Sequence, residues 1–305
     1  MSNSILSAPQ FHDEAAAIAY VEARVWPNGA ICPHCGDVER IGQLKGKSTR
    51  LGVWKCYSCR KPFTVKVGTI FEDSPVKMHL WLQAIMLVAA SKKGISANQL
   101  HRTLGVTLKT AWFMGHRIRH AMDDKSGPLM GSDGGVVEAD ETYIGRKRGR
   151  KVRAAWGHKH AVFTVAERNT GKVRSERARG YHYYSVRSLL DRNVSSKARL
   201  STDEATLYAK LGKRFAEHLT VKHRINEWKR DDGHTNTLEG YFSVFKRGMK
   251  GVYQHCSGDH LHRYLAEFDF RYNNRAKLGV VDAQRADKLI AGVVGKRLTY
   301  RTTGG

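Results

Sequence analysis

Two pairs of closely spaced cysteines constrain the N-terminal part of this chain more than any other feature. The segment CPHCG contains Cys32 and Cys35, and KCYSCRKPFTV contains Cys56 and Cys59. Two such C-x2-C knuckles can bring four thiolates tetrahedrally around one Zn2+. The length between them suits a small antiparallel ribbon, and the segment KPFTVKVGTIF after the second knuckle alternates as a strand does. We therefore predict a zinc ribbon over residues 20-73 that holds one structural Zn2+.

The charge of the chain indicates its class of partner. Of 305 residues, 52 are Lys or Arg and 28 are Asp or Glu, which gives a net charge of +24 that is spread along the sequence. A surface of this kind usually binds a polyanion, and nucleic acid is the leading candidate. The longest apolar run, LWLQAIMLVAA, is too short to span a bilayer. We therefore expect a cytoplasmic, nucleoid-associated protein that has no membrane partner.

A helical segment follows the ribbon over residues 74-125. The stretch VKMHLWLQAIMLVAASKKG has apolar residues at helical spacing, and SANQLHRTLGVTLKTAWFMGHRIRHAM indicates two short helices around a turn at Leu104-Gly105-Val106. A helix pair of this shape resembles a helix-turn-helix, although a helical linker packed on a neighbouring domain is the alternative. On the helix-turn-helix interpretation, three basic residues of the later helix contact DNA: Lys109, Arg117 and Arg119.

The remaining two-thirds of the chain has the pattern of a mixed α/β domain. GGVVEADETYIG predicts a strand that carries Asp140, and HAVFTVAERNTGKVRSERARG predicts a hairpin. A helix follows, then a short strand, ARLSTDE, that ends at Asp203, then a helix, a further short strand and a helix. This order matches a ribonuclease-H-like sheet with flanking helices. We assign it to residues 132-280, with a C-terminal helix and tail over 281-305.

The stretch DDGHTNTLEGYFSVFKRGMKG predicts an amphipathic helix with one apolar face. Its polar face presents Glu239, with Asn236 three residues before it and Lys246 seven residues after it. Such a carboxylate can simply pair with Lys246 or Arg247. However, two other carboxylates, Asp140 and Asp203, belong to predicted strands. Together the three side chains would form an oxygen-rich site for Mg2+.

These motifs together resemble a known family. The order Asp140, Asp203, Glu239, followed by Lys246, resembles the DDE signature of transposases. ADETYIG, LSTDEATLY, GHTNTLEGYFSVFKRGMKG and the zinc ribbon together resemble the zinc-ribbon insertion-sequence transposases, the ISXO-like group, from about residue 20 to 290. In that group either the Asn or the Glu of the H-T-N-x-x-E segment is the third metal ligand. This chain has both, and we favour Glu239 because a carboxylate binds Mg2+ better than an amide does.

The resemblance implies an enzyme that binds double-stranded DNA at the terminal inverted repeats of its insertion sequence. It would cleave phosphodiester bonds with two Mg2+ (or Mn2+) ions and join the 3′-hydroxyl ends to target DNA, as a homodimer or higher oligomer. Asp140 would bridge the ions, while Asp203 and Glu239 would each hold one. Lys246 would contact a phosphate beside the scissile bond.

A basic run, GRKRGRKVRAAWGHKH, follows the first catalytic strand, and we expect it to hold a DNA strand. Its predicted contacts are Arg146, Lys147, Arg148, Arg150 and Lys151. Trp156 in the same run is expected in the core, with stacking on a flipped base as the alternative. Further along, the helix DHLHRYLAEFDFRYNNR presents Arg271 as another candidate DNA contact.

Three other functional hypotheses are weighed against the transposase. The first is a zinc-ribbon and helix-turn-helix regulator whose ribonuclease-H-like domain is not catalytic. The second is a ribonuclease-H-like nuclease that cuts without regard to end sequence. The third is a tyrosine recombinase with Tyr272 or Tyr264 as nucleophile, which leaves the three carboxylates unexplained.

Overall fold

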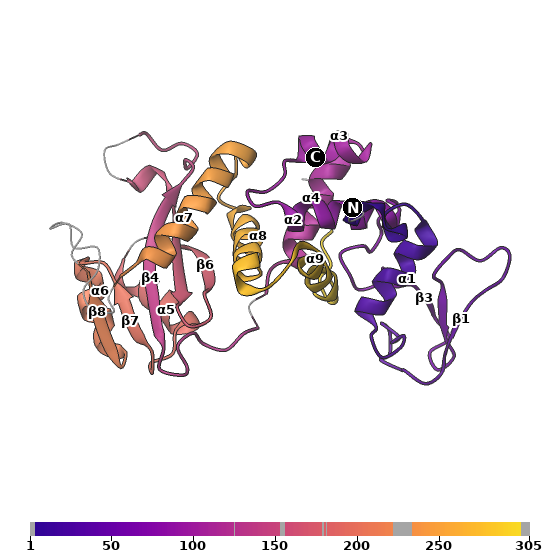
Figure 1. Ribbon diagram of the computed structural model, residues 1–305, viewed down its shortest axis with the longest axis horizontal. Coiled ribbons are helices and arrows are strands. Elements are labelled where there is room, and N and C mark those ends of the chain that lie inside the picture. The colour runs from indigo at the N-terminus through magenta and orange to yellow at the C-terminus, as the bar shows by residue number, and fades with distance from the viewer. Residues whose placement is uncertain are drawn as a thin grey trace. The chain divides into compact units, whose positions relative to one another are not determined.

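The computed structural model describes residues 4–124, 126–152, 156–178, 180, 182–221 and 234–299 (Figure 1). The chain divides into two compact units. The ribbon unit comprises residues 1–91, 95–123 and 280–305, and the sheet unit comprises 92–94 and 124–279. The finer domain boundaries predicted from the sequence stay predictions.

The ribbon unit contains the predicted small antiparallel sheet. Its strands are β1 (Ile41–Gln43), β2 (Trp54–Cys56) and β3 (Pro62–Phe63), paired in that order. The strand expected after the second knuckle is therefore much shorter than its alternating sequence indicated. The backbone turns after Phe63, because the Val67 amide donates to the Thr64 carbonyl and the Thr69 amide donates to the Lys66 carbonyl. The apolar residues of this stretch fill the interior from a turn instead of a strand.

Helices make up the rest of the ribbon unit. They are α1 (Glu14–Val25), α2 (Met78–Ala90), α3 (Ala97–Leu104), α4 (Leu108–Ala121) and α9 (Asp282–Ala291), with the short 3-10 turns η1 (Ile5–Ser7) and η2 (Pro9–Phe11). The helix pair α3–α4 has the predicted turn. Gly105 ends α3 with φ of +66°, a left-handed conformation that favours glycine, and the Thr107 side chain caps α4 by accepting from the Thr110 amide.

A mixed five-stranded sheet forms the centre of the sheet unit, in the order β6-β5-β4-β7-β8. Its strands are β4 (Val136–Ile144), β5 (His160–Glu167), β6 (Lys172–Ala178), β7 (Arg199–Thr202) and β8 (Glu217–Thr220). The strands β4, β5 and β6 pair antiparallel, whereas β4, β7 and β8 pair parallel. The predicted ribonuclease-H-like, mixed α/β fold class is confirmed (Figure 1).

Helices cover both faces of this sheet. They are α5 (Tyr183–Asn193), α6 (Thr206–Leu211), α7 (Asn236–Gly248) and α8 (Leu261–Asn273), with the 3-10 turns η3 (Trp156–His158), η4 (Gly212–Arg214) and η7 (Ala276–Leu278) and the π-helical turn η6 (Met249–Tyr253). Side chains of α5 and α6 share one apolar cluster with Val137 and Ala139, and side chains of α7 and α8 share another with Val162 and Ala166. Because side chains alternate along a strand, Glu138 and Asp140 of β4 point to the face that α7 covers.

Among the residues described, no helix combines the length and the apolar character that crossing a bilayer requires.

Candidate active site and zinc site

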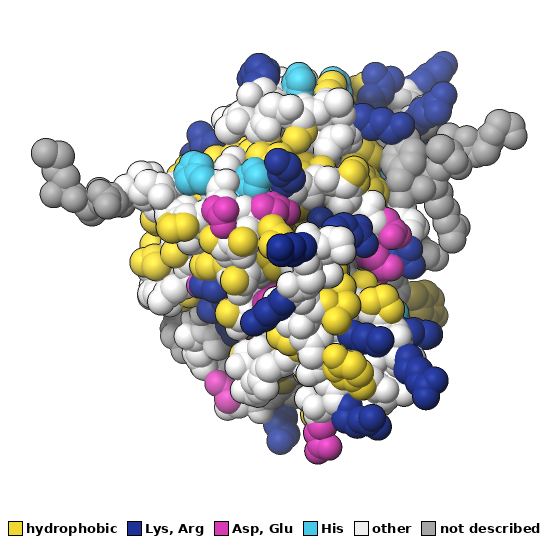
Figure 2. All heavy atoms as spheres, turned by 90° about the vertical axis from the view of Figure 1, so that its right-hand side faces the viewer, with side chains coloured by type: hydrophobic (Ala, Val, Ile, Leu, Met, Phe, Trp, Pro, Cys, Tyr) yellow, Lys and Arg dark blue, Asp and Glu magenta, His cyan; other side chains and the backbone are white. Residues whose placement is uncertain are grey.

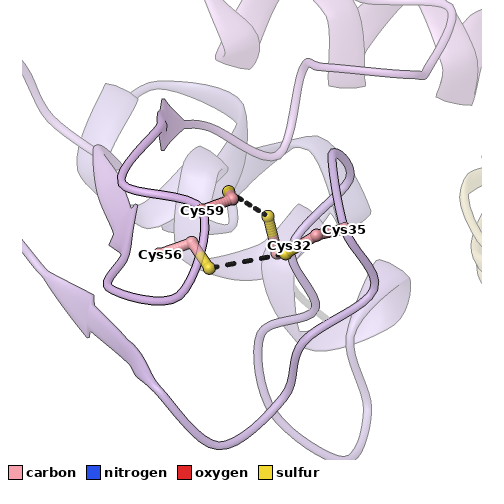
Figure 3. A group of neighbouring side chains, drawn as sticks. All are labelled: Cys32, Cys35, Cys56 and Cys59. Carbon is pink, nitrogen blue, oxygen red and sulfur yellow. Dashed lines mark hydrogen bonds between the residues drawn. The ribbon is translucent and has the colours of Figure 1, made fainter.

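The four cysteines of the two knuckles converge in the ribbon unit (Figure 3). The Sγ atoms of Cys32 and Cys59 lie 3.7 Å apart, and those of Cys35 and Cys56 lie 3.6 Å apart. All four sulfurs lie within 4.8 Å of one another. Sulfurs about 2.3 Å from a central Zn2+ in a tetrahedron are about 3.8 Å apart, so the observed spacing fits a tetrathiolate zinc site.

In the sheet unit, strand pairing brings Asp140 and Asp203 to the same level. The strands β4 and β7 are parallel, with Glu138 opposite Ser201. Continuing that register by two residues places Asp203, the first residue after β7, beside Asp140. Asp140 is two residues from Glu138 on the same strand, so its side chain lies on the α7 face, and the charge of Asp203 raises its pKa. Two carboxylates that are 63 positions apart in sequence thereby become neighbours.

Glu239 reaches the same place because α7 is tied to β4 at its first turn. The carboxylate of Glu138 is fully buried and accepts from the Thr237 amide at 3.1 Å, the Leu238 amide at 3.2 Å and the Thr237 hydroxyl at 2.9 Å. Thr235, the residue before α7, provides no side-chain cap. The carboxylate of Glu138, on β4, caps the helix instead. Glu239 follows one residue after these contacts, on the exposed face of the helix.

Arg168 completes this anchor. Its Nε lies 2.8 Å from the Glu138 carboxylate, and its Nη2 donates to the His234 carbonyl at 2.7 Å. The Ser201 hydroxyl donates to the same carbonyl at 2.9 Å. The segment that leads into α7 is therefore held to both β4 and β7. The sequence analysis did not assign a role to Glu138, although its position two residues before Asp140 on the same strand face is the signal that could have indicated one.

The electrostatics of Asp140 confirm that several carboxylates lie close together. The pKa of Asp140 is raised to about 8, first by burial and then by the negative charge of Glu141. A hydrogen bond from the Glu141 amide, at 2.7 Å, acts in the opposite direction. The charges of Asp203 and Glu239 raise the pKa further, as nearby like charges do. A site with this much unbalanced negative charge is suited to a divalent cation.

The donor set also fits such a cation. Aspartate and glutamate oxygens are the ligands that Mg2+ and Mn2+ prefer, and the site offers carboxylates from β4, the end of β7 and α7. Among the described residues, the four cysteines are the group whose ligand atoms all come within 4.8 Å of one another, so the carboxylates are spaced more widely.

Two further predicted site residues lie on α7. Lys246 is half-buried, and burial lowers its pKa while the charge of Asp140 raises it, which places its ammonium near that carboxylate. Asn236 is exposed at the first position of α7. Asn236 and Glu239 are three residues apart on one helix, so both remain candidates for the third ligand.

The predicted DNA-contacting residues fall into two groups. One group is accessible and comprises Lys109 at the start of α4, the loop residues Arg146, Arg148, Arg150 and Lys151, and the half-buried Lys147. On the face of the molecule shown in Figure 2, Lys and Arg side chains are spread over the surface instead of being gathered in one patch. Residues 153–155 of the basic run lie outside the described residues.

The second group is buried, and the structure does not support its predicted contact with DNA. Arg117 donates to the carbonyls of Ile70 at 2.7 Å and Glu72 at 2.8 Å, so its guanidinium stabilises a turn in the interior. Arg119 is only 5% exposed. Arg271 is 6% exposed and pairs with Glu267 one turn earlier in α8. A guanidinium enclosed in this way is not available to a phosphate.

Two aromatic residues also differ from expectation. Trp156 is 55% exposed, so the expectation of a core tryptophan is wrong. Its ring stacks on Tyr143 with centroids 5.8 Å apart and planes 14° apart. Tyr264, a candidate nucleophile of the recombinase hypothesis, is buried in the apolar cluster under α7 and α8. It has no access to a DNA strand there.

Comparison with known families decides the wider relationship. Residues 133–273 match the model of the ISXO2-like transposase domain, and residues 12–62 match that of a transposase zinc-ribbon domain. The chain belongs to the zinc-ribbon insertion-sequence transposases. The resemblance inferred from its motifs is confirmed, and the ISXO2-like domain contains Asp140, Asp203 and Glu239.

One relative comes from a mobile element. It is an uncharacterized protein in transposable element ISH50 of Halobacterium salinarum, 28% identical over 265 residues that cover 81% of this chain and 86% of the relative. Among solved structures, a chain of the simian T-cell lymphotropic virus intasome in complex with PP2A regulatory subunit B56 gamma matches 62% of this chain. The match spans 65% of that chain at 13% identity, and its TM-score of 0.29 is too low to carry an argument.

Proposed function

We propose that this protein is a DNA transposase that binds the terminal inverted repeats of its own insertion sequence. It cleaves phosphodiester bonds there with two Mg2+ or Mn2+ ions held by Asp140, Asp203 and Glu239, and it joins the 3′-hydroxyl ends to target DNA. The proposal is supported most by the parallel pairing of β4 and β7 together with the charges of Asp203 and Glu239, which raise the pKa of Asp140. The family matches support it.

Each residue has a role that follows from its place. Asp140, Asp203 and Glu239 would hold the ions, because the charges of Asp203 and Glu239 both act on the Asp140 carboxylate. When bound, Mg2+ supplies Lewis-acid stabilisation of phosphate charge and activates the attacking hydroxyl or water. Lys246, close to Asp140 on the helix that carries Glu239, positions a phosphate next to the scissile bond.

The basic loop after β4 holds the DNA backbone beside this site. Its side chains at Arg146, Arg148, Arg150 and Lys151 are exposed, and cations in such a position neutralise phosphates and release counterions. The zinc ribbon and the α3–α4 pair recognise the element's ends. Because two ends must be cut together, the active form is a homodimer or higher oligomer on DNA, in the cytoplasm and associated with the nucleoid.

The test compares strand cleavage with DNA binding for one conservative variant. Asp203→Asn keeps the size of the side chain but removes its charge, so we expect Mg2+-dependent cleavage of a labelled element-end duplex to be lost. Binding of the same duplex in EDTA should stay close to wild type, because the proposed role of Asp203 is to hold a metal ion and EDTA removes that ion. Undiminished cleavage by Asp203→Asn refutes the proposal.

A scrambled-end duplex and the wild-type protein distinguish the other hypotheses. Equal cleavage of the native and scrambled ends would identify a nuclease without end preference. End-specific binding without any cleavage, in Mg2+ or Mn2+, would identify a regulator whose ribonuclease-H-like domain is not catalytic.

A further inference from the structure

Beside the proposed metal site, the sheet unit has a cavity of about 570 Å3. It opens past the end of β4, where Glu141, the residue after Asp140, is part of its wall. We call it the aromatic pocket, and its main lining residues are Tyr143, Trp156, Lys159, His160, Lys246 and Lys250. Its volume lies within the range of about 300–1,000 Å3 that is typical of sites for small organic groups.

The aromatic side of the pocket presents planar surface to solvent. Trp156 is more than half exposed, which is unusual for the largest apolar side chain, and Tyr143 supports its ring from behind by stacking. The Lys159 ammonium lies 4.2 Å from the centroid of the Trp156 ring. An exposed indole held flat in this way is a stacking platform for another planar ring.

The opposite side of the pocket is cationic. Lys246 lies near the end of α7, and Lys250 follows four residues later at the start of η6. At this spacing the two side chains lie on the same face. The charge of Asp140 raises the pKa of Lys246, so this side of the pocket lies near the metal site. Together with Lys159, these side chains place three positive charges around a planar platform. That combination matches a nucleotide, which has a flat base and an anionic phosphate.

A buried histidine forms part of the pocket wall. His160 is 7% exposed, and its buried Nδ1 has no hydrogen-bond partner among the described residues. Burial lowers the pKa of this imidazole, and the nearby charges of Arg177 and Lys147 lower it further. A buried polar nitrogen without a partner is costly.

The backbone next to the pocket is strained. The chain leaves α7 through the π-helical turn η6, and Gln254, which also lines the pocket, has φ of +54°. Left-handed backbone at a residue other than glycine is strained and is found mostly where a function requires it. π-helical turns concentrate at functional sites for the same reason.

We propose that the aromatic pocket binds one unpaired nucleotide of the DNA strand that enters the metal site, with its base stacked on Trp156 and its phosphate held by Lys159, Lys246 and Lys250. The inference rests on the proposed function, since it identifies part of the substrate of the same site. The base replaces the Lys159 ammonium over the indole, and the released ammonium pairs with the phosphate. The nucleotide becomes unpaired at the end of the duplex, where the cost of unstacking is smallest.

The experiment measures affinity without cleavage. Fluorescence anisotropy in EDTA compares a blunt duplex with the same duplex extended by a short run of unpaired thymidines at its 3′ end. We expect wild type to prefer the extended duplex by about tenfold, a factor within the range for one base stacked on an aromatic ring. Trp156→Ala should lose this preference while keeping its affinity for the blunt duplex, and Trp156→Phe should keep part of it.

Tyr184→Ala is the matched control, because Tyr184 is a 76% exposed aromatic residue of the same unit, on α5. It should retain the full preference, and thermal melting should show that all the variants are folded. The proposal is overturned if wild type shows no preference, if Trp156→Ala keeps it, or if Trp156→Ala weakens binding of both duplexes equally. Since no metal is present, these results do not depend on whether Asp203→Asn abolishes cleavage, so the two proposals can fail separately.

Discussion

The anchor between Glu138 and α7 allows a quantitative prediction. Glu138→Gln keeps the volume of the side chain but removes its charge. It also replaces one acceptor oxygen with an NH2 group, which is a donor and faces the hydrogen-bond donors of α7 and Arg168. Glu138 is completely buried, and the side chain of its partner Arg168 is only 16% exposed. Removing one partner of a buried ion pair costs about 3–5 kcal/mol. We expect the lower end of that range, about 3 kcal/mol, because Arg168 retains some contact with water.

A loss of this size should lower the melting temperature of the sheet unit by about 6–12 °C, given about 2–4 °C per kcal/mol for a domain of this size. Differential scanning calorimetry of wild type and Glu138→Gln measures the shift. The control is Glu217→Gln, which removes an Arg199–Glu217 pair with an N···O distance of 2.6 Å from the exposed edge of the same sheet. We expect a cost below about 1 kcal/mol there. Equal melting shifts for the two variants would refute the argument that burial makes Glu138 an anchor.

The other predictions concern the metal sites. Asp140 has a pKa of about 8 in the metal-free fold, well above its unfolded value, so the proton it binds stabilises the fold at acid pH and this contribution is lost as the pH rises through about 8. A cation must displace that proton, so the affinity for Mg2+ should rise about tenfold between about pH 7 and 9. Calorimetry at the lower pH should show the release of close to one proton per site. An affinity that stays constant across this interval would contradict the prediction. If Glu239 is the third ligand, Glu239→Gln abolishes cleavage of the end duplex while Asn236→Ala retains it, and the reverse pattern in the same assay would assign Asn236. Cys56→Ser should release Zn2+ by metal analysis and weaken binding of the native end more than that of a scrambled duplex, because the ribbon loses its fourth thiolate; unchanged zinc content would show that the tetrathiolate site is wrong.

The sequence predicted the framework of the sheet unit well, because that framework depends on local patterns. Alternation defined β4 and the β5–β6 hairpin, and the helical spacing of apolar residues defined α7, whose predicted apolar face is buried. The position of Asp203 immediately after a short strand was also readable. The parallel register of β4 and β7 was not readable, yet it is this register that brings Asp203 to the level of Asp140.

Residues whose environment depends on distant segments could not be placed from the sequence. Arg117 lies on a helix in a run of cations, and nothing local indicates that carbonyls 45 and 47 positions earlier enclose it. Trp156 was expected in the core because tryptophan usually is, whereas here its ring stacks on Tyr143 and is 55% exposed. Glu138 looks like any polar residue of an alternating strand until α7 is seen to begin above it. For Arg117 and Glu138 the deciding contact joins elements that are far apart along the chain.

The account depends most on direct contact between these carboxylates and catalytic cations, and a metal-specificity switch at Asp203 tests that contact. Asp203→Cys replaces a hard oxygen donor with a sulfur, which binds Mg2+ poorly and Mn2+ better. Cleavage of the element-end duplex by this variant should be lost in Mg2+ and partly restored in Mn2+, while wild type is active in both. Cleavage by Asp203→Cys in Mg2+ at the wild-type rate would contradict the claim that Asp203 holds a metal ion.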